Sequence, residues 1–138
     1  MSVAQRLRDQ RGIITGTLVR YAAILLVLGL VAIEGGSIAF TFIRLQNASD
    51  AAALAAADTW SSTRNLRTAR RAARAELDTK DHEDATIVDI EGDGPPLFEI
   101  RLHVRKEAPT ILVNRIGFLS DLGIVEIDAE ARPVQPGV

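Results

Sequence analysis

The residues most able to do chemistry in this sequence are two histidines, one acidic cluster and one glutamate within an apolar stretch. His82 and His103 lie in segments of different character, without the spacing of a metal site or a catalytic triad. The acidic cluster offers oxygen ligands for calcium but lacks the glycine and spacing of an EF-hand loop, so a solvated acidic turn is favoured. The cluster consists of Asp78, Asp81, Glu83 and Asp84. We therefore predict no catalytic, cofactor-binding or metal-binding residue, and a protein that is not an enzyme.

Glu34 is the only acidic or basic residue in the apolar stretch at residues 21–43. As a helix, this stretch would be about 35 Å long, enough to cross a hydrocarbon core of about 30 Å. A charged carboxylate there costs about 2.5–3.5 kcal/mol on insertion scales, so Glu34 should be neutral, hydrated or paired. Two interpretations stay open: Glu34 contacts a polar group of another membrane helix, or it is protonated and reaches water at the outer interface.

Small residues surround Glu34 at a spacing typical of helix–helix contacts in lipid. Ala32 and Gly36, like Gly35 and Ala39, are four positions apart, a spacing that allows two helix backbones to approach closely. We therefore predict helix–helix association through this segment. Because small residues are common in membrane helices, chance spacing is the alternative explanation.

Arginines predict the orientation of this helix, because positive residues hold their end of a span in the cytoplasm. Four precede the stretch and one follows it directly: Arg6, Arg8, Arg11 and Arg20, then Arg44. The prediction is a cytoplasmic segment at residues 1–20, a single-pass transmembrane helix at 21–43 and an extracytoplasmic domain at 44–138. A cleaved secretory signal is the alternative, since residues 37–39 are suited to a signal peptidase, but apolar Phe40 and Phe42 extend beyond them.

Composition limits the external part of the protein. The chain has 138 residues, a formal net charge of −2 and no cysteine. This length, less a membrane helix, allows one small domain with a thin core. The absence of cysteine excludes disulfides and thiolate metal sites, and the near-neutral charge gives no reason to expect nucleic acid as a partner.

The membrane helix should continue beyond the membrane. All prolines follow Gly94, and residues 45–60 are rich in alanine, the best helix former. One stripe is polar (Asn47, Asp50, Asp58), and the residues expected to pack are Leu45, Ala48, Ala52, Ala55 and Ala56. A second helix is predicted at residues 63–77, after a break at residues 61–63. Its five arginines favour a solvated face; binding to anionic head groups or to an acidic partner is the alternative.

In three segments, apolar and polar residues alternate along the sequence, as they do in β-strands with one buried face. The first places Thr86, Val88 and Ile90 on one face, and the third extends over residues 123–131. The second places Phe98, Ile100, Leu102 and Val104 on one face. Glycines and prolines at residues 92–96 predict a hairpin turn, and residues 109–119 predict a short amphipathic helix covering the sheet. The expected fold is α+β and pilin-like: a long N-terminal helix packed against a small antiparallel sheet.

Residues 44–57 have the sequence RLQNASDAAALAAA. This run resembles the "LQnAaDaAALAaA" segment that follows the membrane helix in TadE/TadG-like proteins of the Flp (tight adherence) pilus system. The positions that carry the resemblance are Leu45, Gln46, Asn47, Asp50, Ala52 and Leu54. Processed pseudopilins of this group carry Glu five residues after the cleaved glycine. Here Thr17 stands five residues after Gly12, which argues against processing there.

The resemblance implies a bacterial envelope protein that is a structural or assembly component of a Flp pilus. It would act by association with other pilus-assembly or pilin subunits, as a homo- or hetero-oligomer in contact with membrane lipid. Two alternatives stay open: a processed minor pilin in the fibre, and a membrane-anchored ligand-binding or sensor module.

Overall fold

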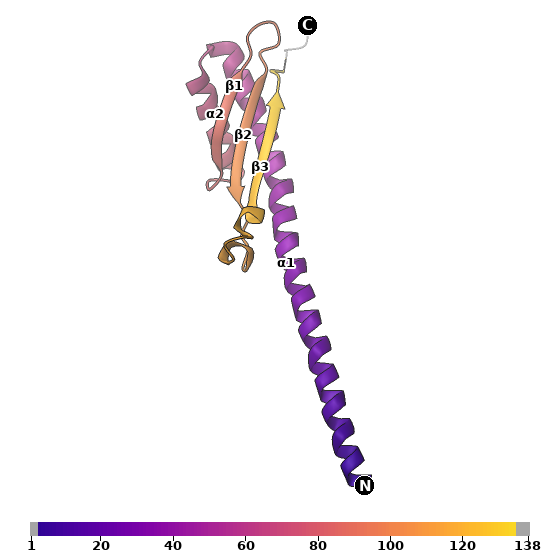
Figure 1. Cartoon of the computed structure of the whole chain (residues 1–138). Coiled ribbons are helices and arrows are strands. Elements are labelled where there is room, and N and C mark those ends of the chain that lie inside the picture. The colour runs from indigo at the N-terminus through magenta and orange to yellow at the C-terminus, as the bar shows by residue number, and fades with distance from the viewer. Residues whose placement is uncertain (1–2, 135–138) are drawn as a thin grey trace. The chain divides into compact units, whose positions relative to one another are not determined.

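The computed structural model describes the backbone of residues 3–134 and the side chains of residues 14–134. The side chains of Arg6, Arg8 and Arg11, which contribute to the predicted orientation, lie outside the described ones. The chain divides into two units, residues 1–36 and 37–138. The described residues form two α-helices, three strands and two short 3-10 helices; Figure 1 shows how the helices and strands are arranged. They are α1 (Val3–Thr63), α2 (Leu66–Thr79), β1 (Thr86–Gly92), β2 (Ile100–Glu107), η1 (Val113–Arg115), η2 (Ser120–Gly123) and β3 (Ile124–Ala131).

Helix α1 continues from the apolar stretch through the alanine-rich segment, as predicted. It ends at Thr63 because Arg64 adopts a left-handed conformation with φ of 52°, a common way for a helix to terminate. The backbone N–H of Arg64 still donates to the carbonyl of Trp60 at 3.0 Å. One unbroken helix thus contributes residues to both units.

Helix α2 confirms the second predicted helix, with a different first residue and cap. Its N-cap is Asn65, whose side-chain oxygen accepts from the backbone N–H groups of Arg67 at 3.0 Å and Thr68 at 3.4 Å. Such a cap satisfies amides that have no partner within the helix. Helix α2 therefore begins at Leu66 rather than at Thr63.

The sheet has the order β1-β2-β3 with both pairs antiparallel, and the predicted hairpin between the first two strands is confirmed. In register, Leu102 of β2 lies opposite Ala129 of β3, and Val104 lies opposite Ile127. The alternation predicted for these strands is confirmed over Ile100, Leu102, Val104, Val125, Ile127 and Ala129, which are all buried. Phe98 precedes β2, and its ring lies under the Arg64 guanidinium, 4.1 Å from Cζ to the ring centroid.

The predicted face of β1 was wrong. Ile87 and Ile90 are buried, whereas Val88 is 50% exposed. The pairing of β1 with β2 shifts between Ile87 and Asp89, which is a β-bulge. Because side chains alternate with a period of two, one extra residue moves the following side chain to the other face. The bulge thus replaces the alternation expected at Thr86, Val88 and Ile90.

The predicted amphipathic helix at residues 109–119 was also wrong. This segment forms turns and η1, and Ile111 and Phe118 are exposed instead of covering the sheet. Residues of α1 and α2 already fill the dry face of the sheet, so no apolar surface is left there for a further helix.

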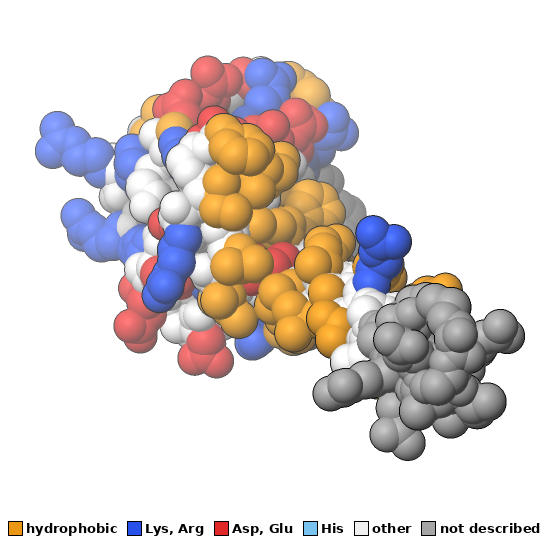
Figure 2. Space-filling view, turned by 60° about the horizontal axis from the view of Figure 1, so that its bottom comes forward, with side chains coloured by type: hydrophobic (Ala, Val, Ile, Leu, Met, Phe, Trp, Pro, Cys, Tyr) orange, Lys and Arg blue, Asp and Glu red, His pale blue; other side chains and the backbone are white. Residues whose placement is uncertain are grey.

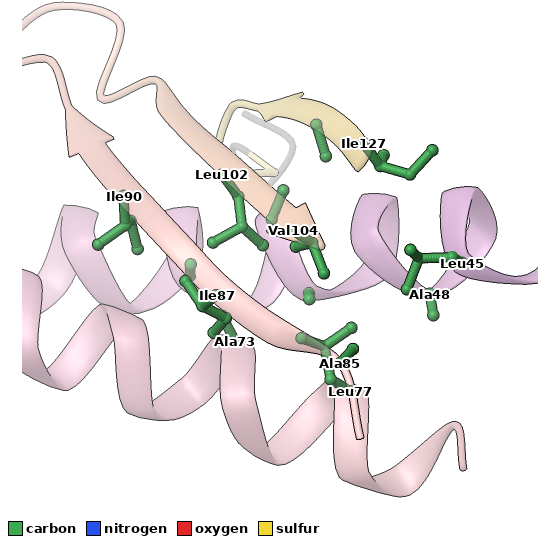
Figure 3. Close-up of a cluster of buried hydrophobic side chains, with 14 of the residues drawn as sticks. Leu45, Ala48, Ala73, Leu77, Ala85, Ile87, Ile90, Leu102, Val104 and Ile127 are labelled. Atoms are coloured by element: carbon green, nitrogen blue, oxygen red, sulfur yellow. The ribbon is translucent and has the colours of Figure 1, made fainter. Parts of the chain in front are cut away.

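The core lies between one face of the sheet and the two helices (Figure 3). Of the residues predicted to pack from α1, Leu45, Ala48, Ala52 and Ala56 are buried, whereas Ala55 is only half-buried. Ala53 and Ala57 join them, together with Ala69, Ala73 and Leu77 of α2. Small side chains let both helix backbones lie close to the strands. The predicted α+β fold, a long helix packed on a small antiparallel sheet, is confirmed.

Candidate functional site

The predicted association segment lies on α1 and has two different sides. Ala32, Gly35 and Ala39 are exposed, and a Cβ added at Gly35 or Gly36 would meet no atom within 4 Å. Glu34, in contrast, is only 7% exposed. Residues four apart share a helix face, whereas residues two apart lie on roughly opposite sides. The helix therefore brings Ala32 and Gly36 onto one open face and directs Glu34 away from them.

The motif at residues 45–54 also divides between two faces. Leu45 and Ala52 are fully buried in the domain core. Asn47, Asp50 and Leu54 are exposed, and Gln46 Nε2 donates a hydrogen bond to Asp50 Oδ1 at 3.0 Å. The motif therefore has a packing face that fits the sheet and a second face available to other molecules.

Two arginines of α2 bind the open edge of the sheet. Arg70 Nη2 donates to the carbonyl of Ile87 at 2.6 Å. Arg74 donates to the carbonyls of Ala85 and Glu83, and its Nη2 lies 2.7 Å from Asp78 Oδ1. The Arg70 contact satisfies a carbonyl of β1, an edge strand that would otherwise be a template for another strand, and the Arg74 contacts satisfy carbonyls in the turn before β1. Arg70 is exposed, as a solvated face predicts, and Arg74 is half-buried, so both lie at the surface while they bind the backbone. Sequence reasoning missed these contacts.

His82 is buried at the turn between α2 and β1. Its Nδ1 lies 3.0 Å from Lys106 Nζ, which also forms a 2.7 Å ion pair with Asp84 Oδ1. Burial, followed by the Lys106 charge, lowers the pKa of His82, and the hydrogen bond from Lys106 lowers the pKa of Asp84. The carboxylate of Asp84 thus binds a lysine of β2. No group of three His, Asp or Glu side chains suited to a metal occurs among the described residues.

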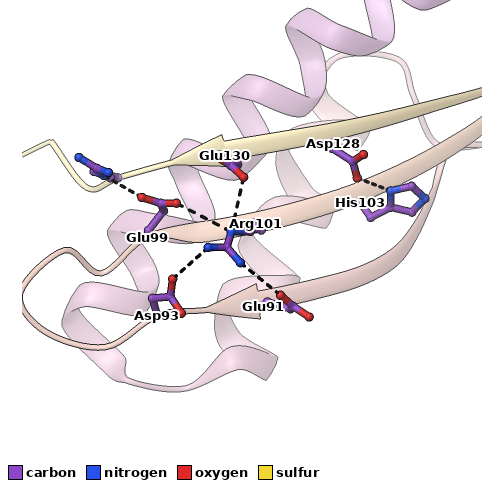
Figure 4. A network of polar contacts seen from close by, with 8 residues as sticks. Glu91, Asp93, Glu99, Arg101, His103, Asp128 and Glu130 are labelled. Atoms are coloured by element: carbon purple, nitrogen blue, oxygen red, sulfur yellow. Dashed lines mark hydrogen bonds and ion pairs between the residues drawn. The ribbon is translucent and has the colours of Figure 1, made fainter.

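The outer face of the sheet is charged (Figure 4). The Arg101 guanidinium lies within 4 Å of four carboxylates, those of Glu91, Asp93, Glu99 and Glu130. Beside them, His103 Nδ1 lies 2.5 Å from Asp128 Oδ1. A hollow of about 470 Å³ lies among these side chains. Exposed ion pairs of this kind each contribute about 0–1 kcal/mol, and the arrangement is a polar surface of mutually paired charges.

Helix α1 contains one candidate membrane span, within Ile14–Thr63, identified by its length and apolar composition. Few of its most apolar residues are buried, and the exposed ones include Leu18, Leu25 and Val31. In water such a surface would be unfavourable, whereas lipid solvates it. These features define a class of protein in which one apolar helix continues into a small α+β domain.

A protein-family model described as "putative Flp pilus-assembly TadE/G-like" matches residues 14–59, a third of the chain. The matched part includes most of the range Ile14–Thr63 that holds the candidate span, together with the association segment and the motif at residues 45–54. The resemblance noted in the sequence is thereby confirmed, and the match supports involvement in Flp pilus assembly and anchoring in a membrane. No curated protein and no solved structure matches the chain.

Proposed function

We propose that this protein is a single-pass membrane component of a Flp-type pilus and acts by associating with other pilus-assembly or pilin subunits. Residues 1–20 would be cytoplasmic, residues 21–43 would cross the membrane, and residues 44–138 would lie outside. The observation that carries the proposal is the family match at residues 14–59, which includes the exposed apolar part of α1. The role is one of assembly rather than catalysis.

The association surface in this proposal is the open face formed by Ala32, Gly35, Gly36 and Ala39. Helices associate in lipid mainly through close packing, since lipid tails are as apolar as leucine side chains. The space beside Gly35 and Gly36 permits such an approach. Glu34 is the polar member of this segment in the proposal, and it lies on the opposite, covered side of α1.

Crosslinking in native membranes tests the association surface. Ala32→Leu and Gly36→Leu add bulk to the open face, and we expect both to lose most of the crosslinked product. Ala23→Leu is a matched control, because nine residues correspond to half a rotation from Ala32 and place the bulk on the opposite face. Unchanged crosslinking in both open-face variants would contradict this surface.

Glu34→Gln and Glu34→Ala separate the two interpretations of that residue. If Glu34 is neutral and hydrogen-bonded, the amide of glutamine should preserve crosslinking and alanine should reduce it. If Glu34 is instead protonated and reaches water without contacting another helix, the Glu34→Ala variant should crosslink as the unchanged protein does.

Thiol labelling tests the orientation, because the chain has no cysteine of its own. Asp128→Cys introduces a thiol at a position whose side chain is 84% exposed. We expect a membrane-impermeant maleimide to label it from outside the inner membrane. Labelling only after the membrane is permeabilised would contradict the proposed orientation. Mass spectrometry tests the alternative of a processed minor pilin. A measured mass equal to that of the full 138-residue chain would contradict it.

A further inference from the structure

The segment between β2 and β3, residues 109–123, here called the β2–β3 loop, exposes a group of large apolar side chains. Ile111 is 57% exposed, Phe118 is 85% exposed and Leu122 is 61% exposed. Leu112 and Ile116 are also exposed. Figure 2, which brings this end of the domain forward, shows hydrophobic side chains gathered on the surface. The domain core does not account for them, since the dry face of the sheet is already filled.

The β2–β3 loop is attached to α1 at a position where the helix is still apolar. Ser37 Oγ donates a hydrogen bond to the carbonyl of Pro109 at 2.5 Å. The apolar stretch continues for six more residues to Ile43, which is about 9 Å along a helix axis. Phe40 and Ile43, within those residues, are exposed. The loop thus begins beside the outer end of the apolar stretch.

We propose that the β2–β3 loop inserts its apolar side chains into the outer leaflet of the membrane, at the boundary between head groups and acyl chains. This inference rests on the membrane anchoring proposed above. The 9 Å between the level of Ser37 and the end of the apolar stretch agrees with the depth of about 5–10 Å at which interfacial segments lie. Lipid is the occupant because the loop is bound to α1 at Ser37, next to the exposed apolar side chains of Phe40 and Ile43.

The backbone of the β2–β3 loop is suited to this environment, because unpaired amides are costly near hydrocarbon. Its turns satisfy several of its own groups: the N–H of Ile116 donates to the carbonyl of Leu112 at 3.1 Å, and that of Leu119 to Ile116 at 2.8 Å. The N–H of Leu122 donates to Leu119 at 2.9 Å. The exposed Arg115 side chain is long enough to reach lipid phosphates from such a position.

Asn114 and Gly123 pack together at the base of the β2–β3 loop. Asn114 Nδ2 donates to the carbonyl of Ala108 at 3.3 Å. A Cβ added at Gly123 would lie only 2.4 Å from Asn114 Oδ1, so any larger residue there would displace the Asn114 side chain. The base of the loop is therefore packed tightly while its apolar side chains point outward.

Depth-dependent quenching tests the proposal on the full chain, reconstituted in vesicles of phosphatidylcholine and phosphatidylglycerol that contain doxyl-labelled lipid. Single cysteines would carry the environment-sensitive fluorophore NBD. Phe118→Cys reports on the loop, and Leu28→Cys reports on the span. Leu97→Cys is the control, since it is an exposed leucine in the loop at the other end of β2. We expect doxyl lipid to quench the labels at positions 118 and 28 and to leave the weaker, water-exposed emission of the label at 97 unchanged.

The outcomes separate this inference from the proposed anchoring. Quenching at position 28 with no quenching at 118 would overturn the loop proposal and leave the anchoring intact. No quenching at position 28 would overturn both. Fluorescence at 118 that responds to the number of copies per vesicle, and not to doxyl lipid, would show docking on a second copy and would also overturn it. Ile111→Cys is a second label site should the first variant fail to fold.

Discussion

The two parts of α1 differ in what surrounds them, although both are predominantly apolar. Up to Gly36 the side chains are mostly large and exposed, with Leu18 and Leu25 as examples. Beyond Leu45 the helix is dominated by alanine, and Ala52 and Ala56 are fully buried against the sheet. Side-chain size, more than hydrophobicity, therefore distinguishes the exposed part of α1 from the part buried against the sheet.

The physical reason lies in how each environment stabilises a helix. A sheet in water gains stability when apolar strand side chains are covered, and alanine lets the helix backbone approach closely enough to cover them. Lipid chains adapt to the helix surface and do not require close approach of the backbone. Large apolar side chains are therefore tolerated on a membrane helix. Substitutions of matched size in the two parts should therefore have very different effects.

The largest contrast is expected for leucine truncation. Leu102→Ala removes a fully buried side chain of β2 and should lower the free energy of unfolding of the domain by about 2–5 kcal/mol. Leu25→Ala, in the exposed part of α1, should leave it unchanged. Urea unfolding in detergent, followed by the fluorescence of the single tryptophan Trp60, measures both. Equal unfolding midpoints would refute the assigned core.

Enlarging alanine sharpens the same comparison. Ala52→Leu places extra methyl groups in a filled core and should cost about 1–3 kcal/mol. Ala23→Leu makes the same chemical change at an exposed position of α1 and should be tolerated. Thermal unfolding of both variants in the same detergent is the measurement, and similar losses would show that the alanine-rich part is not closely packed.

The contacts of α2 with the sheet edge should have a smaller effect. Arg74→Ala removes hydrogen bonds to the carbonyls of Ala85 and Glu83 and an ion pair with Asp78, which should cost about 1–2 kcal/mol. Arg71→Ala is the matched control, because Arg71 is exposed on the same helix. Hydrogen exchange of the β1 amides should rise in the first variant only. Equal hydrogen exchange in the two variants would show that the contacts of Arg74 do not stabilise β1.

The smallest expected effect concerns pH. Burial lowers the pKa of His82 below its ordinary value of 6.5, so the unfolded chain takes up a proton at a higher pH than the folded one. Stability from this residue is fully present above pH 6.5 and decreases as the pH falls towards the lowered value. His82→Gln should reduce that slope in unfolding titrations between pH 7 and 5. The control His103→Gln, on the outer face of the sheet, should retain the pH dependence of stability that comes from His82.

Local patterns predicted most of the fold. The alternation of β2 and β3 is visible because each strand has one dry face, and the long helix is visible because no proline interrupts it. The first strand was predicted correctly, but its buried face was misassigned because the bulge at Val88 depends on pairing with β2, which local alternation does not reveal. The segment at residues 109–119 was misassigned because its helical spacing has no free apolar surface to pack against in this domain.

The candidate surfaces were predictable to a different extent. The positions of Ala32, Gly36 and Glu34 follow from sequence spacing, and the motif at residues 45–54 was recognisable from its letters. The contacts of Arg70 with Ile87 and of His82 with Lys106 were not, because each joins residues far apart in the chain. Only the spacing of Arg70 and Arg74, one helical turn apart, could have suggested a shared partner.

By itself, the sequence determined which segment is apolar and long enough to span a membrane, where alanine replaces larger residues and which strands have a dry face. These properties depend on neighbours within a few residues. The tertiary structure alone decided which side of α1 is covered, how α2 binds the edge of β1 and that the β2–β3 loop presents its apolar side chains outward. Those outcomes depend on whether another segment already occupies the available surface, and no local pattern contains that information.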